Sequence, residues 1–243
     1  SRFKQVIPPF SLFWTMMIHD HWMHKQEPDF VKQYLKSIKE VLDWHKNKID
    51  PKTGMLGELP FWNFVDWPKE WPWMGYDEIS GLPKGSEKGN SSIHTLQFVY
   101  AINKAVELFV AFGLKDAAKE YKAIAHSLKE STYKLCWDKD KNMLADLPDK
   151  LEFSQHANVL AVLTDMEYIN DSKLMTQIVA DTNIVQCTIY YRFYLNQALK
   201  KAGLGNRYVE LLSPWRNMLA IGLTTFAEKP EPSRSDCHAW SAS

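Results

Sequence analysis

The stretches DPKTGMLGELP (Asp50–Pro60) and DKDKNMLADLP (Asp138–Pro148) are two copies of one turn, and they decide the expected fold. An aspartate, a Met-Leu pair, an acidic residue and a Leu-Pro ending coincide position by position. Each copy follows a Lys-rich amphipathic segment, and Gly54 or Asn142 supplies a residue that tolerates a left-handed turn conformation. A unit that recurs after two outer helices predicts a toroid of helical hairpins. The alternative is a chance similarity between two turns that end helices.

Helical periodicity dominates the rest of the chain, and alternating runs of strand length are scarce. The expected helices span residues 9–24, 28–49, 91–113, 115–136, 154–166, 171–182, 187–202 and 206–221, with a ninth opening near Cys237. Residues 91–113 are apolar on two faces, which indicates an inner helix, whereas residues 115–136 have the two-sided pattern of an outer helix. We therefore predict an all-α fold, with residues 1–243 forming one domain.

The composition excludes several classes of partner. Lys plus Arg (29) balances Asp plus Glu (29), so no electrostatic attraction to nucleic acid is expected. No run approaches the ~20 apolar residues needed to cross a membrane, so no membrane partner is expected. Three scattered cysteines indicate neither a disulfide framework nor a zinc cluster. The N-terminus has no signal-like region, and Ser1 and Ser243 are interpreted as cut ends of a longer polypeptide.

Aromatic residues make up 13% of the chain, and four of the ten Trp crowd into one long connection. Segment 61–90 is broken by Pro and Gly, and structureless loops of this length are uncommon unless they are functional. It carries Trp62, Trp67, Trp71 and Trp73. Rings exposed from loops suit sugar-binding clefts, because the apolar face of a pyranose stacks on a flat ring. In a helical toroid the long connections gather on one face, so a carbohydrate substrate is expected there.

Hydrolysis of a glycoside needs two carboxyl groups, and loops of this chain carry several. The candidates are Asp66, Asp77, Glu78, Glu228, Glu231 and Asp236. Glu228 follows an apolar run, which would hold it at the end of a rigid element; its alternative is an ordinary solvated glutamate. Asp66 stands between two apolar neighbours and is better placed for desolvation than a residue at a loop tip. The alternative is that Asp66 has a structural role, as a helix cap or as a hydrogen-bond partner within a turn.

The histidines do not predict a metal site. His19, His21 and His24 are spaced H-x-H-x-x-H on an expected helix, but His19 points away from the face that the other two share. Ser154 is placed to cap a helix, and His156 just after it is either a buried, hydrogen-bonded residue or a ligand contact. Phosphate-binding glycine loops, nucleophile elbows and paired C-x-x-C motifs do not occur. No metal or organic cofactor is expected.

Five ordered strings carry a family resemblance: IPPFSLFW (7–14), FVDWP (64–68), SQHANVLAVL (154–163), TTFAE (224–228) and SRSDCHAWSAS (233–243). Together they resemble the catalytic domain of bacterial α-L-rhamnosidases, glycoside hydrolase family 78. The resemblance implies an α/α toroid of the six-hairpin barrel type. It also implies hydrolysis of terminal α-L-rhamnosides, in plant or bacterial glycans and glycosides, with inversion at the anomeric carbon.

The same resemblance assigns roles to individual residues. Glu228 falls on the general base of the family, and Trp67 and His238 fall on residues that line the rhamnose subsite. Phe10 falls where the family often places another aromatic wall, and Asp66 is expected to bind sugar hydroxyls or to help hold the attacking water. The residues expected to lie behind these side chains and hold them in position are Trp62, His156 and Trp240.

One departure from the family pattern changes the expectation for this chain. The general acid of the family lies in a segment with D-E-R followed by G-W, and no such string occurs here. Eight or nine helices are expected where a closed barrel needs twelve. The chain is therefore interpreted as the C-terminal part of the barrel, which on its own should be inactive and which has other domains of the parent polypeptide as partners. Family habit suggests a periplasmic or extracellular location.

Two other functions stay open at the level of the sequence. The chain could belong to another α/α-barrel glycosidase, acting for example on glucosides or fucosides, because only the FVDW and SDCHAW strings favour rhamnose. It could also be a non-catalytic helical protein that binds carbohydrate through its loop aromatics, with Glu228 incidental. The aglycone, the linkage and the oligomeric state are not specified by the sequence.

Overall fold

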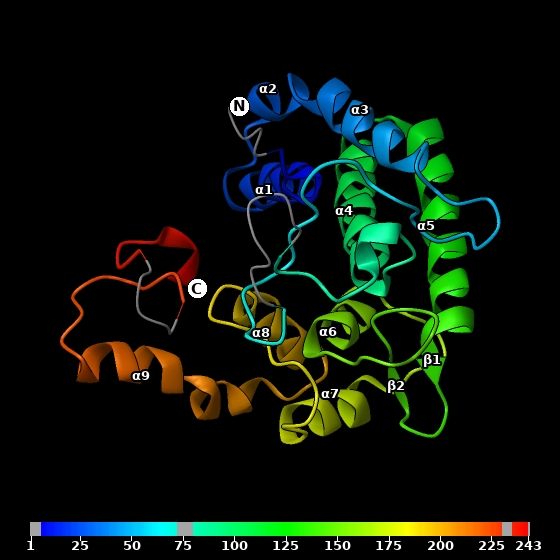
Figure 1. Cartoon of the computed structure of the whole chain (residues 1–243). Helices are drawn as coiled ribbons and strands as arrows, with labels where there is room; N and C mark the ends of the chain where they lie inside the picture. The colour runs from blue at the N-terminus through cyan, green and yellow to red at the C-terminus, as the bar shows by residue number, and fades with distance from the viewer. Residues whose placement is uncertain (1–5, 72–79, 230–234, 243) are drawn as a thin grey trace, which may run out of the picture.

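The computed structural model describes residues 6–71, 80–229 and 235–242, and helices dominate this part of the chain (Figure 1). The helices are α1 (Pro8–Lys25), α2 (Pro28–Lys32), α3 (Leu35–Lys46), α4 (Ser92–Ala111), α5 (Lys115–Cys136), α6 (Gln155–Leu163), α7 (Asp171–Ala180), α8 (Arg192–Lys201) and α9 (Ser213–Ala220). Strands β1 (Trp137–Asp138) and β2 (Met143–Leu144) form one small antiparallel pair. Short 3-10 turns span Ser86–Lys88, Gly205–Leu211 and Ala239–Ser241.

The sequence-based elements differ from these in four places. The helix expected over 28–49 is divided into α2 and α3, and the helix expected over 206–221 is a 3-10 helix (Gly205–Leu211) followed by α9. The helix expected from residue 187 begins at Arg192, because the preceding residues are held in a turn by contacts to the site described below. The helix expected near Cys237 is only the 3-10 turn Ala239–Ser241. The all-α class is confirmed.

The helices form an inner and an outer layer. Helices α1, α4, α6 and α8 pack against one another in that order, and α3, α5 and α7 each pack outside an inner helix (Figure 1). Phe13 of α1 stacks on Tyr194 of α8 at a centroid distance of 5.7 Å, which brings the first and last inner helices together. Hairpins that alternate between an inner and an outer layer are the architecture expected from the repeated turn, which is confirmed.

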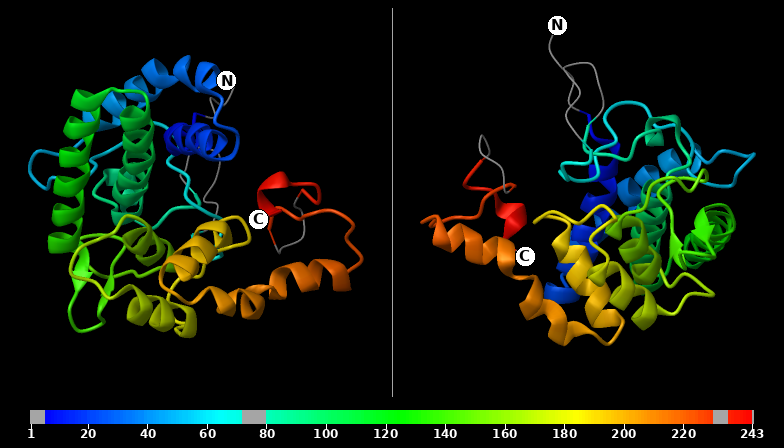
Figure 2. Two further views of the ribbon diagram at one scale, coloured as in Figure 1. Left: turned by 180° about the vertical axis from the view of Figure 1, so that it is seen from behind. Right: turned by 60° about the horizontal axis from the view of Figure 1, so that its bottom comes forward.

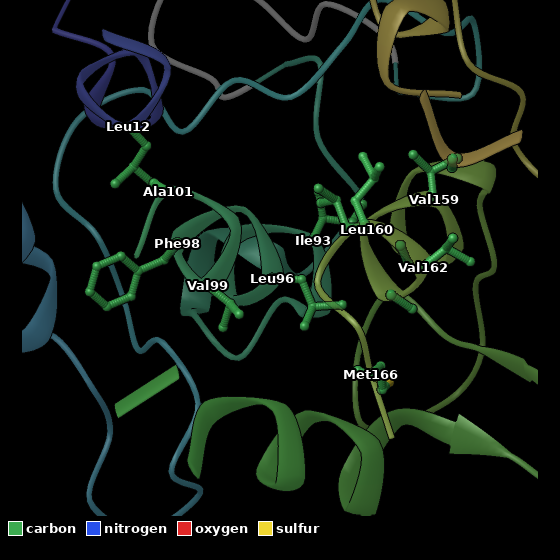
Figure 3. Packing of buried hydrophobic residues seen from close by; sticks show 14 of the residues in the cluster. Leu12, Ile93, Leu96, Phe98, Val99, Ala101, Val159, Leu160, Val162 and Met166 are labelled. Carbon is green, nitrogen blue, oxygen red and sulfur yellow. The ribbon is translucent and has the colours of Figure 1, made fainter. Parts of the chain in front are cut away.

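The core lies between the inner helices (Figure 3). Every residue of α6 is buried, and buried side chains of α4 such as Leu96 and Phe98 point to several sides of that helix. This burial explains why these segments are apolar on more than one face: each is covered by a helix on either side as well as by an outer helix.

The two copies of the repeat have the same structure. Ile49 bridges Leu56 in the first copy, and Trp137 pairs with Leu144 at the equivalent positions of the second. Gly54 (φ +72°) and Asn142 (φ +52°) both adopt the expected left-handed conformation. The sequence repeat therefore corresponds to a structural repeat.

The repeat extends into the inner helix that follows each turn. The Leu56 amide donates to Thr95 Oγ1 of α4 at 3.1 Å, and the Leu144 amide donates to Asn158 Oδ1 of α6 at 2.8 Å. Each acceptor lies four residues after the serine at the N-cap of its helix. Both turns are thereby fixed to the N-terminal end of an inner helix, and the long connections 47–91 and 137–154 meet at that end of the molecule.

Helix α9 stands apart from the two layers, as both views of Figure 2 show. It is held by a small separate core of Ile189, Met218 and Ala227, with Trp215 and Leu223 packed against it. The Trp215 indole donates to the Ser241 carbonyl at 2.8 Å, which ties α9 to the C-terminal segment. Within the residues that the structure describes, no helix is both long and apolar enough to cross a membrane.

Three buried titratable groups set an expectation for stability against pH. Burial lowers the pKa of His45 and of His94 to about 4, although each ring donates to a backbone carbonyl. Burial raises the pKa of Asp146 to about 8, against a hydrogen bond from Ser154. Between pH 4 and 6.5 the unfolded chain binds two more protons at the histidines than the folded protein does, and one fewer at the aspartate. Because the unfolded chain thus binds one more proton in total, the free energy of unfolding rises with pH in this range. Between pH 6.5 and 8 only the aspartate contributes, and stability falls.

We therefore predict a maximum in the melting temperature near pH 6.5, measured by thermal denaturation from pH 4 to 8. Asp146→Asn should remove the decline above the maximum and steepen the acid limb. His94→Gln should remove about half of the histidine contribution, which is worth up to about 3 kcal/mol per residue. A melting temperature that stays level from pH 6.5 to 4 in both the unmodified chain and Asp146→Asn would contradict the prediction.

Candidate active site

The buried carboxylate of Asp66 joins three segments that are far apart in the sequence. It is fully buried and accepts four hydrogen bonds. The donors are the Trp67 amide (2.8 Å), Nε2 of His156 (2.7 Å), the Thr188 amide (2.8 Å) and the Thr188 hydroxyl. His156 is in the first turn of α6, where the positive end of the helix dipole favours an acidic partner. The contacts fix the 61–71 connection to α6 and to the turn before α8.

His156 is a buried, hydrogen-bonded residue and does not reach the surface. Its ring lies between Trp71 and Tyr191, at centroid distances of 4.7 and 4.5 Å. Because a carboxylate only accepts, the proton of the ring is on Nε2, and Nδ1 has no partner among the described residues. Of the two interpretations of His156 left open by the sequence, the structure supports the buried one.

The connection before Asp66 is held at defined points. Nε2 of His94 on α4 donates to the Asn63 carbonyl at 2.8 Å, and the amides of Val65 and Asp66 donate to the Gly81 carbonyl at 2.8 and 3.1 Å. Gly81 has a φ of +71°, and a Cβ there would lie 2.6 Å from the Phe64 ring. Glycine is required because the backbone passes directly over that ring.

Phe64 is the centre of a group of aromatic rings that we call the aromatic cluster. Its members are Phe10, Trp62, Phe64, Trp67, Tyr190 and Trp240, and the Phe64 ring lies within 6.4 Å, centroid to centroid, of each of the others. They come from α1, the 61–71 connection, the turn before α8 and the C-terminal segment. Phe64 itself is only 2% exposed, whereas Phe10 is 39% exposed. The cluster thus has a buried base and an accessible side.

The C-terminal segment packs onto this cluster and onto the loop that carries Glu228. The Glu228 amide donates to the Ser235 carbonyl at 2.8 Å, and the His238 amide donates to the Phe226 carbonyl at 2.9 Å, so the two stretches run antiparallel. The Trp240 ring stacks on Tyr190 at 4.7 Å, and its indole lies 3.4 Å from the Glu228 carbonyl. Figure 2 shows this segment beside α9 and near α8. The segment is a docked part of the site.

Glu228 lies at the edge of the aromatic cluster. Its side chain is half-buried, and one carboxylate oxygen is 3.4 Å from the Ser235 amide. The next residue, Lys229, places its ammonium 5.5 Å from the centre of the Trp67 ring. The His238 ring packs on Trp240 at 4.1 Å, and its buried Nδ1 has no partner among the described residues. The backbone of Glu228, the Lys229 side chain and the His238 ring are thus in contact with members of the aromatic cluster.

The structure brings together most of the residues expected from the sequence. Phe10, Trp62, Trp67 and Trp240 belong to the aromatic cluster, and Glu228 and His238 border it. Asp66 and His156 lie beneath it. Because Asp66 has no exposed surface and both its oxygens already accept protein donors, its expected role as a direct sugar ligand is revised to that of a buried anchor. Four residues singled out in the sequence lie outside the described residues: Trp73, Asp77, Glu78 and Glu231.

Phe64, Tyr190 and Thr188 were not expected from the sequence. Phe64 is two residues before Asp66 in the string FVDW, and Tyr190 belongs to the aromatic-rich stretch TIYYRFY. The aromatic content of that stretch could have indicated a binding site, but it is equally typical of a core helix. Nothing in the sequence pairs Thr188 with Asp66, 122 residues away.

Two of the hollows formed by the described residues lie near the connections of the site. One, of about 370 Å³, is bounded by α9 and by Ile189, Ala227 and Lys229, the last two being the neighbours of Glu228 in the sequence. The other, of about 610 Å³, is lined by residues of the 137–154 connection and of the α7–α8 connection, including Phe153 and Asp181, and by Glu70 of the 61–71 connection. The first hollow is therefore next to the segment that carries Glu228, and the second is at the end of the 61–71 connection.

No metal centre is formed by the described residues, among which no three His, Cys, Asp or Glu side chains are grouped to hold an ion. Two of the three histidines of the H-x-H-x-x-H motif have carboxylate partners. Nε2 of His19 lies 2.8 Å from Glu107, and Nε2 of His21 lies 3.0 Å from Glu27.

Comparison with known proteins places this geometry in a family. The profile of the bacterial alpha-L-rhamnosidase 6 hairpin glycosidase domain matches residues 5–243. The chain belongs to this family. It is thus a glycoside hydrolase domain of the α/α six-hairpin type, and the family resemblance of the five sequence strings is confirmed. A search of curated protein sequences returns no significant match.

Solved structures agree with the fold of the rhamnosidase family. A GH78 family rhamnosidase of Bacillus sp. GL1 is 24% identical with a TM-score of 0.81, over 98% of this chain and 26% of that one. A rhamnosidase from Klebsiella oxytoca with rhamnose bound is 17% identical with a TM-score of 0.80, over 98% of this chain and 46% of that one. The 243 residues therefore span about a quarter and about half of these two chains.

The anchor role of Asp66 predicts a large loss of stability in Asp66→Asn. In the variant, the N–H hydrogens of the new side-chain amide would point at protein donors that now bond to a carboxylate oxygen. We therefore expect the free energy of unfolding to fall by roughly 3 kcal/mol. The measurement is urea denaturation followed by tryptophan fluorescence. Asp140→Asn, at an exposed site, is the matched control and should change stability by less than about 0.5 kcal/mol. Equal stabilities for the two variants would show that the carboxylate of Asp66 is not an anchor.

Proposed function

We propose that this chain forms part of an α-L-rhamnosidase that hydrolyses terminal α-L-rhamnosides with inversion, and that Glu228 is the general base. The observation that carries the proposal is the packing of the loop that carries Glu228 against the aromatic cluster in a domain of the rhamnosidase family. The solved Klebsiella oxytoca rhamnosidase, which has the same fold, holds rhamnose. The substrate is accordingly a carbohydrate whose terminal unit is rhamnose.

In this proposal Glu228 takes a proton from the attacking water. An inverting enzyme places its base and its acid on opposite faces of the sugar, with carboxyl groups ~6.5–9.5 Å apart to leave room for the water. Trp67 stacks on the apolar face of the rhamnose, and His238 donates a hydrogen bond to a hydroxyl near the base. Asp66 acts by holding Trp67 in place. The backbone amide of Trp67 donates a hydrogen bond to the Asp66 carboxylate, and this contact fixes the backbone that carries the indole.

The general acid is proposed to lie outside these 243 residues. The D-E-R and G-W segment that supplies it in the family does not occur in the sequence. General acid–base assistance is worth typically ~10²–10⁴-fold per group. We therefore expect the purified 243-residue chain to show no turnover of p-nitrophenyl α-L-rhamnoside above background. A polypeptide that also carries the preceding segment should be active, and equal rates for the two would contradict the proposal.

The role of Glu228 is tested by Glu228→Gln in that longer polypeptide. The substitution keeps size and hydrogen bonding but deletes basicity. We expect kcat to fall by at least ~10²-fold with little change in KM, because the loss belongs to the transition state. Azide should restore part of the activity and yield a product of inverted configuration.

Two control variants accompany this test. Glu231→Gln, three residues further along the chain, should be nearly silent. If Glu228→Gln kept a normal kcat while Glu231→Gln or Asp236→Asn lost it, the base would be another carboxylate of this segment. A panel of p-nitrophenyl glycosides separates rhamnose from glucose or fucose as the preferred sugar.

A second function is favoured by the aromatic cluster itself, since stacked rings bind sugar whether or not a carboxylate is nearby. In a purely carbohydrate-binding protein, Glu228→Gln would leave rhamnose affinity unchanged and the longer polypeptide would have no hydrolytic activity for the substitution to reduce. The turnover assay therefore decides between the two.

A further inference from the structure

Helix α9 is joined to the helical layers by little apolar packing. Met218 is the buried residue of this helix, and with Ile189 and Ala227 it forms the small separate core. The hollow of about 370 Å³ borders the same three residues. Side chains that fill an interface hold two elements in one orientation, whereas a hollow leaves room for movement. The orientation of α9 therefore depends on contacts outside this core.

The Arg192 side chain makes such a contact. Arg192 is the first residue of α8, and its Nη1 donates to the Leu211 carbonyl at 2.6 Å. Leu211 ends the 3-10 helix Gly205–Leu211, and α9 begins two residues later, at Ser213. The last carbonyls of a helix have no partner within that helix, so a side-chain donor there fixes the point at which the chain changes direction. Arg192 thus holds the start of α9 against the start of α8.

The same guanidinium reaches back to the turn that is bonded to Asp66. Nε of Arg192 donates to the Cys187 carbonyl at 3.4 Å. The next residue, Thr188, bonds to Asp66 through its amide and its hydroxyl, and the Cys187 amide donates to Oε1 of Gln155 on α6 at 2.9 Å. Burial lowers the pKa of Arg192, and the charge of Asp66 opposes this shift. One side chain therefore joins the anchored turn to the start of α9.

The chain leads from α9 directly to Glu228. The helix ends at Ala220, and Glu228 is in the loop that follows. This loop meets the aromatic cluster through the Lys229 ammonium over Trp67 and through the Glu228 carbonyl, which is 3.4 Å from the Trp240 indole. A change in the direction of α9 would therefore move Glu228 relative to Trp67. A misplacement of about 1 Å in a catalytic group can cost roughly 100-fold in rate.

We propose that Arg192 is a positioning residue that sets the place of Glu228 relative to Trp67. It does so by bonding the turn anchored on Asp66 to the start of α9, and it does not touch the substrate. The inference rests on the proposed function, which makes Glu228 the general base and Trp67 a wall of the sugar site. The orientation of α9 can be measured independently of that function.

The first test measures the distance between α9 and the outer layer in the 243-residue chain. Spin labels are attached at Leu219→Cys on α9 and at Lys119→Cys on α5, both exposed positions. Cys237→Ser removes the exposed native thiol, whereas Cys136 and Cys187 are buried and should not react. The distribution of distances between the two labels is read by double electron–electron resonance.

The labelled chain with Arg192 intact should give one narrow distribution. Arg192→Met keeps an apolar stem but removes every donor, so it should broaden the distribution or add a second distance. Arg216→Met is the matched control, because the Arg216 guanidinium is exposed and donates to the Val209 carbonyl at 3.4 Å. This control should leave the distribution unchanged. Identical distributions with and without Arg192, or a broad one with Arg192 intact, would overturn the inference.

The second test measures kinetics in the longer polypeptide that carries the preceding segment. Arg192→Met should lower kcat by about 10- to 100-fold with little change in KM, because a misplaced base is a loss in the transition state. Arg192→Lys keeps the charge and can donate to one of the two carbonyls, so it should recover part of kcat. It also serves as the test variant if Arg192→Met does not fold. Rates are referred to the folded fraction, measured by circular dichroism.

The two tests separate failure of the inference from failure of the proposed function. A normal kcat in Arg192→Met, or equal losses in Arg192→Met and Arg216→Met, would overturn the inference while the loss in Glu228→Gln still supported the proposed function. A normal kcat in Glu228→Gln would contradict the proposed function, and this inference with it.

Discussion

The site depends on one buried carboxylate. Asp66 accepts hydrogen bonds from its own connection, from α6 and from the turn before α8. A buried carboxylate is tolerated only when hydrogen-bond donors of this kind satisfy it. Once Asp66 is fixed, the backbone of Trp67 is fixed, Phe64 lies under Gly81, and the rings of Tyr190 and Trp240 close over Phe64. The apolar cluster is therefore built on a polar anchor.

The hairpin architecture supplies the place for that anchor. Each repeat turn is bonded to a polar residue in the first turns of the next inner helix, so the long connections all begin or end at one side of the helical layers. Connections that meet at one side can combine residues from distant parts of the sequence, as Asp66 and Thr188 do.

The fold was predictable from the sequence, for an identifiable reason. The turn repeat gave the hairpins because Gly54 and Asn142 mark equivalent left-handed positions. The sequence strings that contain Glu228, Trp67 and His238 lie close together in the structure, and the roles of these residues stay predictions. The role of Asp66 was not predictable, since it depends on a partner 122 residues away, and a loop aspartate in isolation reads equally well as a ligand.

The most direct test of the anchoring role is hydrogen–deuterium exchange of the Trp67 and Thr188 amides. Both donate to the buried Asp66 carboxylate, so they should exchange as slowly as the core amides of α4 and α6, although both lie outside helices. In Asp66→Asn both should become fast together while α4 keeps its protection. If the two amides exchange at the rate of exposed loop positions in the unmodified chain, Asp66 is not the anchor of the site and the account is wrong.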